Sequence, residues 1–322
     1  MQGRAAVAAR CTLPGSGATI DAVNAGEITL VDAAKGEGFP AARSGSILSS
    51  SAPLGWRGIA VERHRLVPQE LPEHYVVGHG LAVSTGSRPI RFGWRHGLGS
   101  WKEGVLNPGE FHLLTHGDLN TPHWLDTFDE VTLVLDRRFV ADVVKEDLPE
   151  DRIVFMSQRS RSDPTVARYA GAFREEMEAR GPNGALYADT LAIGFVLHLL
   201  THYAVARPTV PAPKGKLNSF QLRGVVELIH DQLDEDLSLV VLAERANVSP
   251  FHFARLFRAT VGVTPHQFVL HQRVQRSLAL IKAGGRPLAQ IAIDCGFHDQ
   301  PHFTRAFRKV VGTTPAKFLV GK

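Results

Sequence analysis

Two fourteen-residue stretches near the C-terminal end of the chain follow one pattern. HFARLFRATVGVTP spans His252–Pro265 and HFTRAFRKVVGTTP spans His302–Pro315, so every shared position is displaced by fifty residues. Each copy reads H-F-x-R-x-F-R, then three residues and G-x-T-P, and a phenylalanine follows two residues later, at Phe268 or Phe318. A duplication this regular restricts the segment to two copies of one helical unit.

Within each copy the two phenylalanines share one face of a helix. Phe253 and Phe257 are four residues apart, while Arg255 projects from a different face, and the second copy repeats this arrangement. The glycine of each copy is a helix stop, and the Thr-Pro pair that follows starts another helix. The sequence therefore predicts two equivalent phenylalanine cores, each with arginines on another face.

Upstream of each copy lies a second matching element. LAERANVS and IAIDCGFH each predict a short apolar helix and a tight turn, at Asn247 or Gly296. A helix, a short turn and a longer helix make a helix-turn-helix module, whose second helix lies in the major groove of DNA. The intervening helix, from Thr264 to about Ala283, would be about 30 Å long. Successive major grooves lie about 34–36 Å apart, so this helix can place two recognition helices on one DNA site.

Charge is concentrated in the same region. The formal net charge is +4, but residues 237–322 carry 12 Lys and Arg against 3 Asp and Glu. Such a basic block favours a polyanionic partner. The alternatives are a soluble basic surface, or a helical bundle in which the repeat reflects duplication alone. The doubled module favours DNA, since packing alone does not require both copies to keep exposed arginines.

The segment from Leu217 to Leu319 resembles the DNA-binding domain of AraC/XylS-type bacterial transcription regulators. The second module, IAIDCGFHDQPHFTRAFRKVVGTTPAKF, is the closest match to the signature of that family. The resemblance implies seven C-terminal helices and a regulator that activates transcription. The first half, with the runs HYVVGH, NPGEFHLL and DEVTLVLD, is similar to the cupin-like sensing domains of the family.

The expected fold class is an α+β multidomain chain. A cupin-like antiparallel β-barrel or sandwich, followed by two helices (Pro164–Arg180 and Leu186–Ala204), precedes an all-α domain with two helix-turn-helix modules. The predicted domains are a poorly ordered, Ala-, Gly- and Ser-rich arm or mis-assigned start over 1–50, a cupin-like sensing and dimerisation domain over 51–205, a Pro-rich linker over 206–216, and the double helix-turn-helix domain over 217–322.

The family pattern assigns the DNA-contacting residues. They lie at and after the start of each recognition helix: Ser249, Phe251, His252, Ala254, Arg255 and Arg258 in the first module, and Gln300, Pro301, His302, Thr304, Arg305 and Lys309 in the second. Arginine suits guanine and glutamine suits adenine, whereas Arg308 and Lys309 suit phosphates. For Arg255 and Arg305 an ion pair within the domain is the alternative. The shared histidine of each copy could instead cap or pack.

The first half contains several histidines but no metal-ligand spacing. His112 and His116 fall in a strand and turn, where four-residue spacing places no common helical face, so neither a metal nor another cofactor is expected. An unknown small-molecule effector is expected instead. Candidate lining residues are Trp94, His96, Trp101 and Trp124, for which ordinary packing is the alternative.

Partners and location follow from these expectations. Two cysteines exclude a disulfide framework and indicate a reducing compartment, and no apolar run is long enough to span a membrane, so the chain is expected in the cytoplasm. The expected partners are promoter DNA, RNA polymerase as a further candidate, the effector, and a second copy in a homodimer formed through 186–204. The chain is thus predicted to be a transcription regulator and not an enzyme. A cupin-type metalloenzyme fused to a DNA-binding domain, and a nucleoid protein without sequence preference, are the alternatives.

Overall fold

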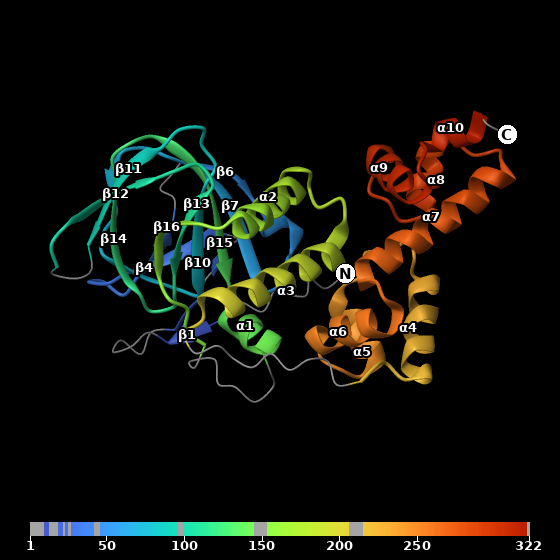
Figure 1. Cartoon of the computed structure of the whole chain (residues 1–322), viewed down its shortest axis with the longest axis horizontal. Coiled ribbons are helices and arrows are strands. Elements are labelled where there is room, and N and C mark those ends of the chain that lie inside the picture. Colours follow the sequence, from blue (N-terminus) through green and yellow to red (C-terminus); the bar gives the residue numbers. More distant parts are fainter. Residues whose placement is uncertain are drawn as a thin grey trace. The chain divides into compact units, whose positions relative to one another are not determined.

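The computed structural model describes residues 10–12, 19–21, 23–24, 27–41, 46–95, 99–144, 153–205 and 215–320 (Figure 1). The chain divides into two compact units. Unit 1 comprises Met1–Glu178 and Gly194–Val210, and unit 2 comprises Ala179–Ile193 and Pro211–Lys322. Most of the predicted linker, 206–214, lies outside the described residues. The division differs from the predicted domains, because residues 179–193 group with the C-terminal helices.

Unit 1 is rich in antiparallel strands. A six-stranded sheet has the order β16-β13-β10-β15-β7-β6, and an eight-stranded sheet has the path β12-β11-β14-β9-β4-β3, with β5 paired to β4 and β8 to β14. The strands are β1 (Arg10–Thr12), β2 (Thr19–Asp21), β3 (Val23–Asn24), β4 (Glu27–Asp32), β5 (Gly38–Pro40), β6 (Ile47–Ser50), β7 (Ile59–Leu66), β8 (Gln69–Glu70), β9 (His74–Val76), β10 (His79–Ser84), β11 (Ile90–Arg95), β12 (Lys102–Leu106), β13 (Glu110–Leu114), β14 (Leu119–Trp124), β15 (Phe128–Leu135) and β16 (Gln158–Ser162).

Alternating apolar residues explain why these strands face a common core. In β11, Ile90 and Phe92 are buried and the intervening Arg91 is exposed, as expected for a strand with one face covered. Ile90 and Phe92 belong to an aromatic cluster with Trp124 and Phe128. The predicted β-rich first half is confirmed at this level.

Part of the segment predicted as an arm over 1–50 lies in the larger sheet. β4 pairs with β9 in the larger sheet, and Ile28 and Val31 are 2% and 0% exposed. The Ala, Gly and Ser composition of the first fifty residues obscured this short strand. Two buried side chains and the ladder hydrogen bonds to the sheet are enough to order it.

Helices make up the rest of the described chain. They are α1 (Arg137–Val144), α2 (Pro164–Glu178), α3 (Gly184–Tyr203), α4 (Ser219–Asp231), α5 (Leu239–Ala246), α6 (Pro250–Val261), α7 (Pro265–Ala283), α8 (Leu288–Asp294), α9 (Gln300–Val311) and α10 (Pro315–Val320), with a short 3-10 turn over Ala52–Leu54. The resemblance implied seven C-terminal helices, and residues 215–320 form seven, α4 to α10. The predicted helices before the linker correspond to α2 and α3.

The long apolar helix α3 contributes to both units. It begins at Gly184 in unit 2 and ends at Tyr203 in unit 1. By length and composition alone it is one helix of the described chain that could cross a membrane, a property that buried core helices share. Its apolar side chains are buried or half-buried.

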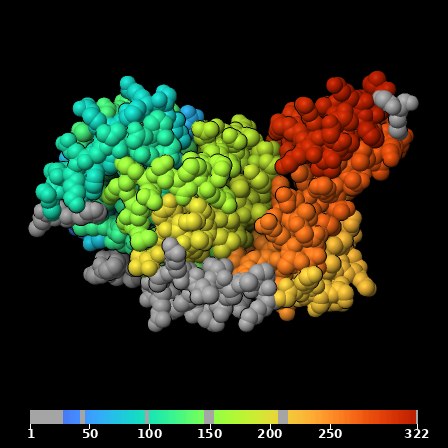
Figure 2. All heavy atoms as spheres, viewed as in Figure 1, coloured from blue at the N-terminus to red at the C-terminus, as the bar shows by residue number. Residues whose placement is uncertain are grey.

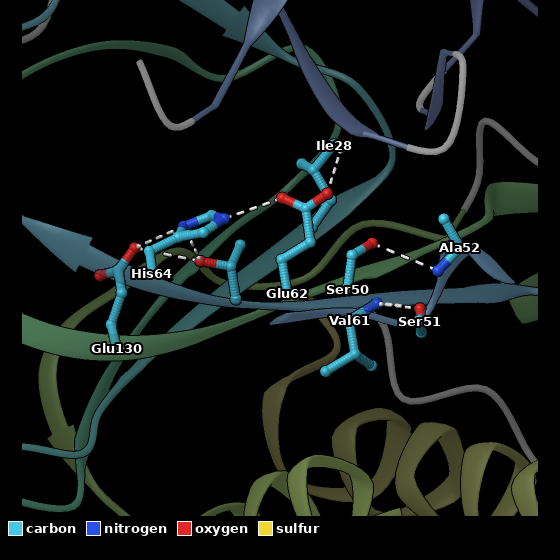
Figure 3. A network of polar contacts seen from close by, with 9 residues as sticks. Ile28, Ser50, Ser51, Ala52, Val61, Glu62, His64 and Glu130 are labelled. Carbon is cyan, nitrogen blue, oxygen red and sulfur yellow. Dashed lines mark hydrogen bonds and ion pairs between the residues drawn. The ribbon is translucent and has the colours of Figure 1, made fainter. Parts of the chain in front are cut away.

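A buried ionic network links three strands of unit 1 (Figure 3). On β7, His64 Nε2 lies 2.8 Å from Glu62 Oε2, and its Nδ1 lies 3.2 Å from Thr132 Oγ1 and 3.6 Å from Glu130 Oε1 on β15. Glu62 Oε1 also accepts the backbone N–H of Ile28 on β4. Burial alone would lower the pKa of His64, but the hydrogen bonds and charges of Glu130 and Glu62 outweigh it and raise the pKa to about 9. The imidazolium therefore offsets two buried carboxylates.

Replacing this histidine should destabilise unit 1 severely. His64→Gln leaves two buried carboxylates without a cation, so we expect a loss of about 3–5 kcal/mol in the free energy of unfolding. All four tryptophans lie between residues 56 and 124, so tryptophan fluorescence in a urea titration reports on unit 1. In the unmodified chain the contribution of His64 is fully present below about pH 6.5, the ordinary pKa of histidine, and is lost as the pH rises through about 9.

Arg65→Gln is the matched control on the same strand. The side chain of Arg65 is 58% exposed and pairs with Asp129 at the surface, so its loss should lower the free energy of unfolding far less than the loss of His64. Equal urea midpoints for His64→Gln and the unmodified chain would contradict the assignment of His64 as a buried cation.

Candidate nucleic-acid interface

Two helix pairs in unit 2 have the same local construction. The first helix pair is α5–α6 and the second helix pair is α8–α9; the second, with α10, is coloured dark orange to red in Figure 2. Asn247 turns the chain between the first two helices in the left-handed region, with φ 54°, and Gly296 does so in the second pair, with φ 81°. The two turns predicted from the sequence therefore lie at the predicted residues.

Side-chain caps and prolines fix where the longer helices begin. Ser249 Oγ accepts the backbone N–H of His252 at 3.4 Å, and α6 starts at Pro250. The carboxylate of Asp299 accepts the backbone N–H of His302 at 2.6 Å at the start of α9. A residue that fixes φ at the first helical position and an oxygen that pairs a free N–H both favour a helix start here.

The two phenylalanine cores form as the repeat predicts. Phe253, Phe257, Phe303 and Phe307 are each 0% exposed. Within the pairs the ring centroids are 5.4 and 5.5 Å apart, and Phe268 and Phe318 lie 5.5 and 5.8 Å from the second ring of their own pair. Burying one face of α6 and α9 in this way leaves the opposite face of each helix to carry the charged side chains.

The exposed face of the first helix pair contains most of its predicted contact residues. His252 and Arg258 are exposed, and Ser249, Ala254 and Arg255 are half-buried. The Arg255 guanidinium carbon lies 5.1 Å from the centroid of the Phe251 ring. Phe251 is only 7% exposed, so the structure places it in the core, where its ring packs against the Arg255 guanidinium.

The second helix pair exposes Gln300, Pro301 and Arg305. Thr304 is half-buried, and its hydroxyl donates to the backbone carbonyl of Gln300 at 2.9 Å. Arg308 and Lys309 are exposed near the end of α9.

Unpaired cations mark both faces. No ion pair with a described carboxylate involves any of five exposed or half-buried cations, Arg255, Arg258, Arg305, Arg308 and Lys309. The alternative of ion pairs within the domain therefore has no support among the described residues. Cations that neutralise no protein carboxylate remain available to an external polyanion.

His302 does not lie on this exposed face. It is 5% exposed, and its Nε2 lies 2.9 Å from Asn183 Oδ1. Burial, and next the positive charge of Arg305, lower the pKa of His302 to about 4, so the imidazole is neutral near pH 7. The repeat gave no sign of this difference from the exposed His252, because Asn183 lies more than a hundred residues away in the sequence.

Sequence reasoning also missed the residues that join the two helix pairs. Arg273 of α7 is 9% exposed, and its guanidinium donates to the backbone carbonyls of Leu233 and Glu235 at 2.9 and 2.7 Å. Gly296 packs so closely on this loop that an added Cβ would collide with the carbonyl oxygen of Leu233 and approach Asp234 Cα at 2.9 Å. A glycine at the turn was expected; its close approach to the first helix pair was not.

A family model described as "Helix-turn-helix domain" matches residues 242–320. Among curated proteins, the probable transcriptional regulator LumQ of Photobacterium leiognathi is 36% identical over 72 residues, covering 22% of this chain and 29% of LumQ. The arabinose operon regulatory protein of Salmonella typhimurium is 28% identical over 153 residues, covering 42% of this chain and 53% of that protein. Residues 242–320 thus match a helix-turn-helix domain and are similar to part of known transcription regulators. The chain thus spans between about a third and about half of the length of these relatives.

A solved structure is similar to about a third of the chain. The crystal structure of the DNA-binding domain of AdpA in complex with a target DNA is 30% identical to it, covers 32% of this chain and 93% of that one, and has a TM-score of 0.31. LumQ and the arabinose operon protein are both named as regulators.

The candidate effector residues of unit 1 are dispersed. Trp101 is 41% exposed and packs beside Arg95, and His96 lies outside the described residues. Trp94 and Trp124 do share a cluster, because both contact Phe92, at ring-centroid distances of 5.0 and 6.1 Å.

Two polar residues that sequence reasoning missed join this cluster. The guanidinium carbon of Arg159 lies 5.7 Å from the Trp94 ring, and it forms no ion pair with a described carboxylate. His112 contacts Phe92 at 4.6 Å, and its Nδ1 accepts the backbone N–H of Ser160. Neither His112 Nε2 nor Trp124 Nε1 has a partner in the described chain. In that part of the chain no three His, Cys, Asp or Glu residues are grouped to hold a metal ion.

The close packing at Gly296 can be tested against a glycine with the same backbone. Gly312 has φ 85° and open space where a Cβ would lie, whereas Gly296 has φ 81° with the loop against it. Gly312→Ala should cost about 1–2 kcal/mol through the left-handed backbone alone. Gly296→Ala should cost about 1–3 kcal/mol more, because the added carbon overpacks the loop.

Hydrogen exchange of the α8–α9 amides, followed by mass spectrometry, measures both costs as local opening free energies. Equal losses for the two variants would contradict a direct contact between the second turn and the α4–α5 loop.

Proposed function

We propose that the chain is a transcription regulator of the AraC/XylS type that binds promoter DNA through two helix-turn-helix modules, the first and second helix pairs. The observation that carries the proposal is the set of unpaired cations on the open faces of α6 and α9. DNA binding draws on such cations for phosphate contacts and, where the arginine reaches a base edge, for sequence readout.

The length of α7 supports use of one continuous DNA site. At 1.5 Å per residue, its 19 residues extend about 28 Å. This is close to the roughly 34–36 Å between successive major grooves on one face of DNA. One chain would then fill two neighbouring grooves without a second copy.

The two modules would read different bases. In the proposed contact set the first helix pair supplies Ser249, His252, Ala254, Arg255 and Arg258, and the second supplies Gln300, Pro301, Thr304, Arg305 and Lys309. Phe251 and His302 drop out of direct contact, since both are buried. The remaining differences between the two sets favour an asymmetric operator and disfavour a nucleoid protein without sequence preference.

Unit 1 would sense a small molecule. The cluster of Trp94, Trp124, His112 and Arg159 supports this, because a half-buried guanidinium and two unpartnered buried nitrogens beside aromatic rings favour a ligand that has hydrogen-bond acceptors. A cupin-type fold, activation through RNA polymerase, a homodimer and a cytoplasmic location belong to the same proposal. A fused metalloenzyme is not favoured, because the relatives are regulators.

The binding proposal predicts a measurable loss at Arg305. Arg305→Ala should weaken binding to the preferred DNA by about 1–3 kcal/mol and relax sequence preference at one position, since one cationic contact to a base or phosphate is removed. The affinity is measured by fluorescence anisotropy at fixed salt, with DNA selected by the unmodified chain from a random-sequence library. Lys317→Ala, which removes an exposed cation of α10 outside the contact set, controls for the lost charge. Equal affinities for Arg305→Ala and Lys317→Ala would contradict the role of Arg305.

A further inference from the structure

The two copies of the repeat differ at their shared histidine. His252 is exposed on α6, whereas His302, fifty residues later on α9, is buried with its Nε2 against Asn183 Oδ1. Because the amide oxygen of Asn183 can only accept, Nε2–H of His302 donates to it, and Nδ1 has no described partner. Asn183 therefore covers a surface of the second helix pair whose counterpart in the first helix pair is open.

The same segment is attached to the first helix pair. The backbone N–H of Ala185 donates to Asp236 Oδ1 at 3.0 Å, on the loop between α4 and α5. Asp189 Oδ2 accepts the backbone N–H of Leu239, the first residue of α5, at 3.1 Å. Gly184 makes this approach possible, because its φ is +75° and a Cβ there would collide with the Asp236 carboxylate.

A third attachment is to α7, the helix between the two pairs. The ring centroid of Tyr187 lies 5.0 Å from that of His266. Asn183, Asp236, His266 and His302 also line one small pocket together with Arg273. Residues 183–189 thus contact both helix pairs and the helix that joins them, all within unit 2.

We propose that residues 183–189 form a brace that fixes the second helix pair relative to the first, and so sets the spacing at which the two recognition helices engage DNA. The consequence for spacing rests on the proposed DNA-binding function. Asn183, Asp189 and Asp236 are then positioning residues that touch no DNA. The brace is the start of α3, whose later residues belong to unit 1, so a change in unit 1 that displaces α3 would act on the geometry of the two helix pairs.

The direct contact between the helix pairs does not make the brace redundant. Arg273 and Gly296 hold the α4–α5 loop against α7 and the second turn. Arg276 of α7 also pairs with Asp234 of this loop at 3.7 Å, so these contacts of α7 and the second turn are all made to the α4–α5 loop. The hydrogen bond of the brace at Asp236 adds to the attachments on this loop, whereas those at Leu239 and His302 attach the brace to α5 and α9, outside the loop.

The brace can be tested without DNA by the distance between two spin labels. Ala259→Cys on α6 and Ala316→Cys on α10 are exposed labelling positions, in a chain that also carries Cys11→Ser. The remaining thiol, Cys295, is 0% exposed, and burial raises its pKa to about 11, so it should not react. Pulsed electron spin resonance on the full chain should give a narrow distance distribution. Adding Asn183→Ala and Asp236→Ala should at least double its width.

Asp231→Ala is the matched control, because this exposed carboxylate ends α4 a few residues before Asp236. It should leave the width unchanged. Far-UV circular dichroism confirms that the helices remain in every variant. A distribution as narrow in the Asn183→Ala, Asp236→Ala chain as in the control would overturn the brace.

The consequence for DNA is measured with the selected DNA and a version with one base pair inserted between its two subsites. The unmodified chain should lose at least tenfold in affinity on insertion, and the Asn183→Ala, Asp236→Ala chain threefold or less. Equal discrimination by both chains would overturn the spacing role. If the unmodified chain selects no DNA with two subsites, the proposed function fails, and the spin-label distances still decide whether the brace exists.

Discussion

The arrangement of unit 2 depends on one buried guanidinium. Arg273 is almost fully enclosed, so its donors must be paired within the protein, and they pair with two carbonyls of the α4–α5 loop. Those carbonyls lie in the loop after α4, where the Glu235 carbonyl also accepts the backbone N–H of Leu237. The pairing holds the loop against α7, and Gly296 then admits the second turn to the same loop. The residues that join the two copies of the repeat therefore lie outside both fourteen-residue copies.

The sequence alone predicted the structural features that depend on neighbouring residues or that occur in both copies of the repeat. Capping residues and prolines predicted the starts of α6, α7 and α10, and four-residue spacing predicted which phenylalanines are buried. The environments of His252 and His302 could not be predicted in the same way. The repeat makes them equivalent, and the difference arises from Asn183, a residue that no periodicity connects to either. Surfaces depend on distant partners, whereas cores in a repeat depend on the repeat itself.

In unit 1 the sequence predicted a β-rich class but not its edges or its ionic centre. The strand that contains Ile28 and Val31 is too short to stand out from an Ala-, Gly- and Ser-rich segment, and the sheet supplies most of what orders it. The stretch VERHRL reads as a polar, half-exposed strand, yet Glu62 and His64 point into the interior. His64 pairs with Glu62 on its own strand and with Glu130 on β15, and the pairing of β7 with β15 cannot be read from either strand alone.

Of the two copies of the repeat, only the second contacts Asn183 through its shared histidine, and this difference gives the domain a contact through which it can be regulated. Two identical modules joined by a helix have no preferred partner for the rest of the chain. One copy retains a surface that accepts Asn183, and the other copy keeps its corresponding histidine exposed. The free-energy cost of burying His302 is small. Its ring already packs against Phe297 of the second core, and its Nε2–H needs only one hydrogen-bond acceptor, which Asn183 supplies. A segment that holds the second module through one hydrogen bond and the first through two can be released without unfolding either core.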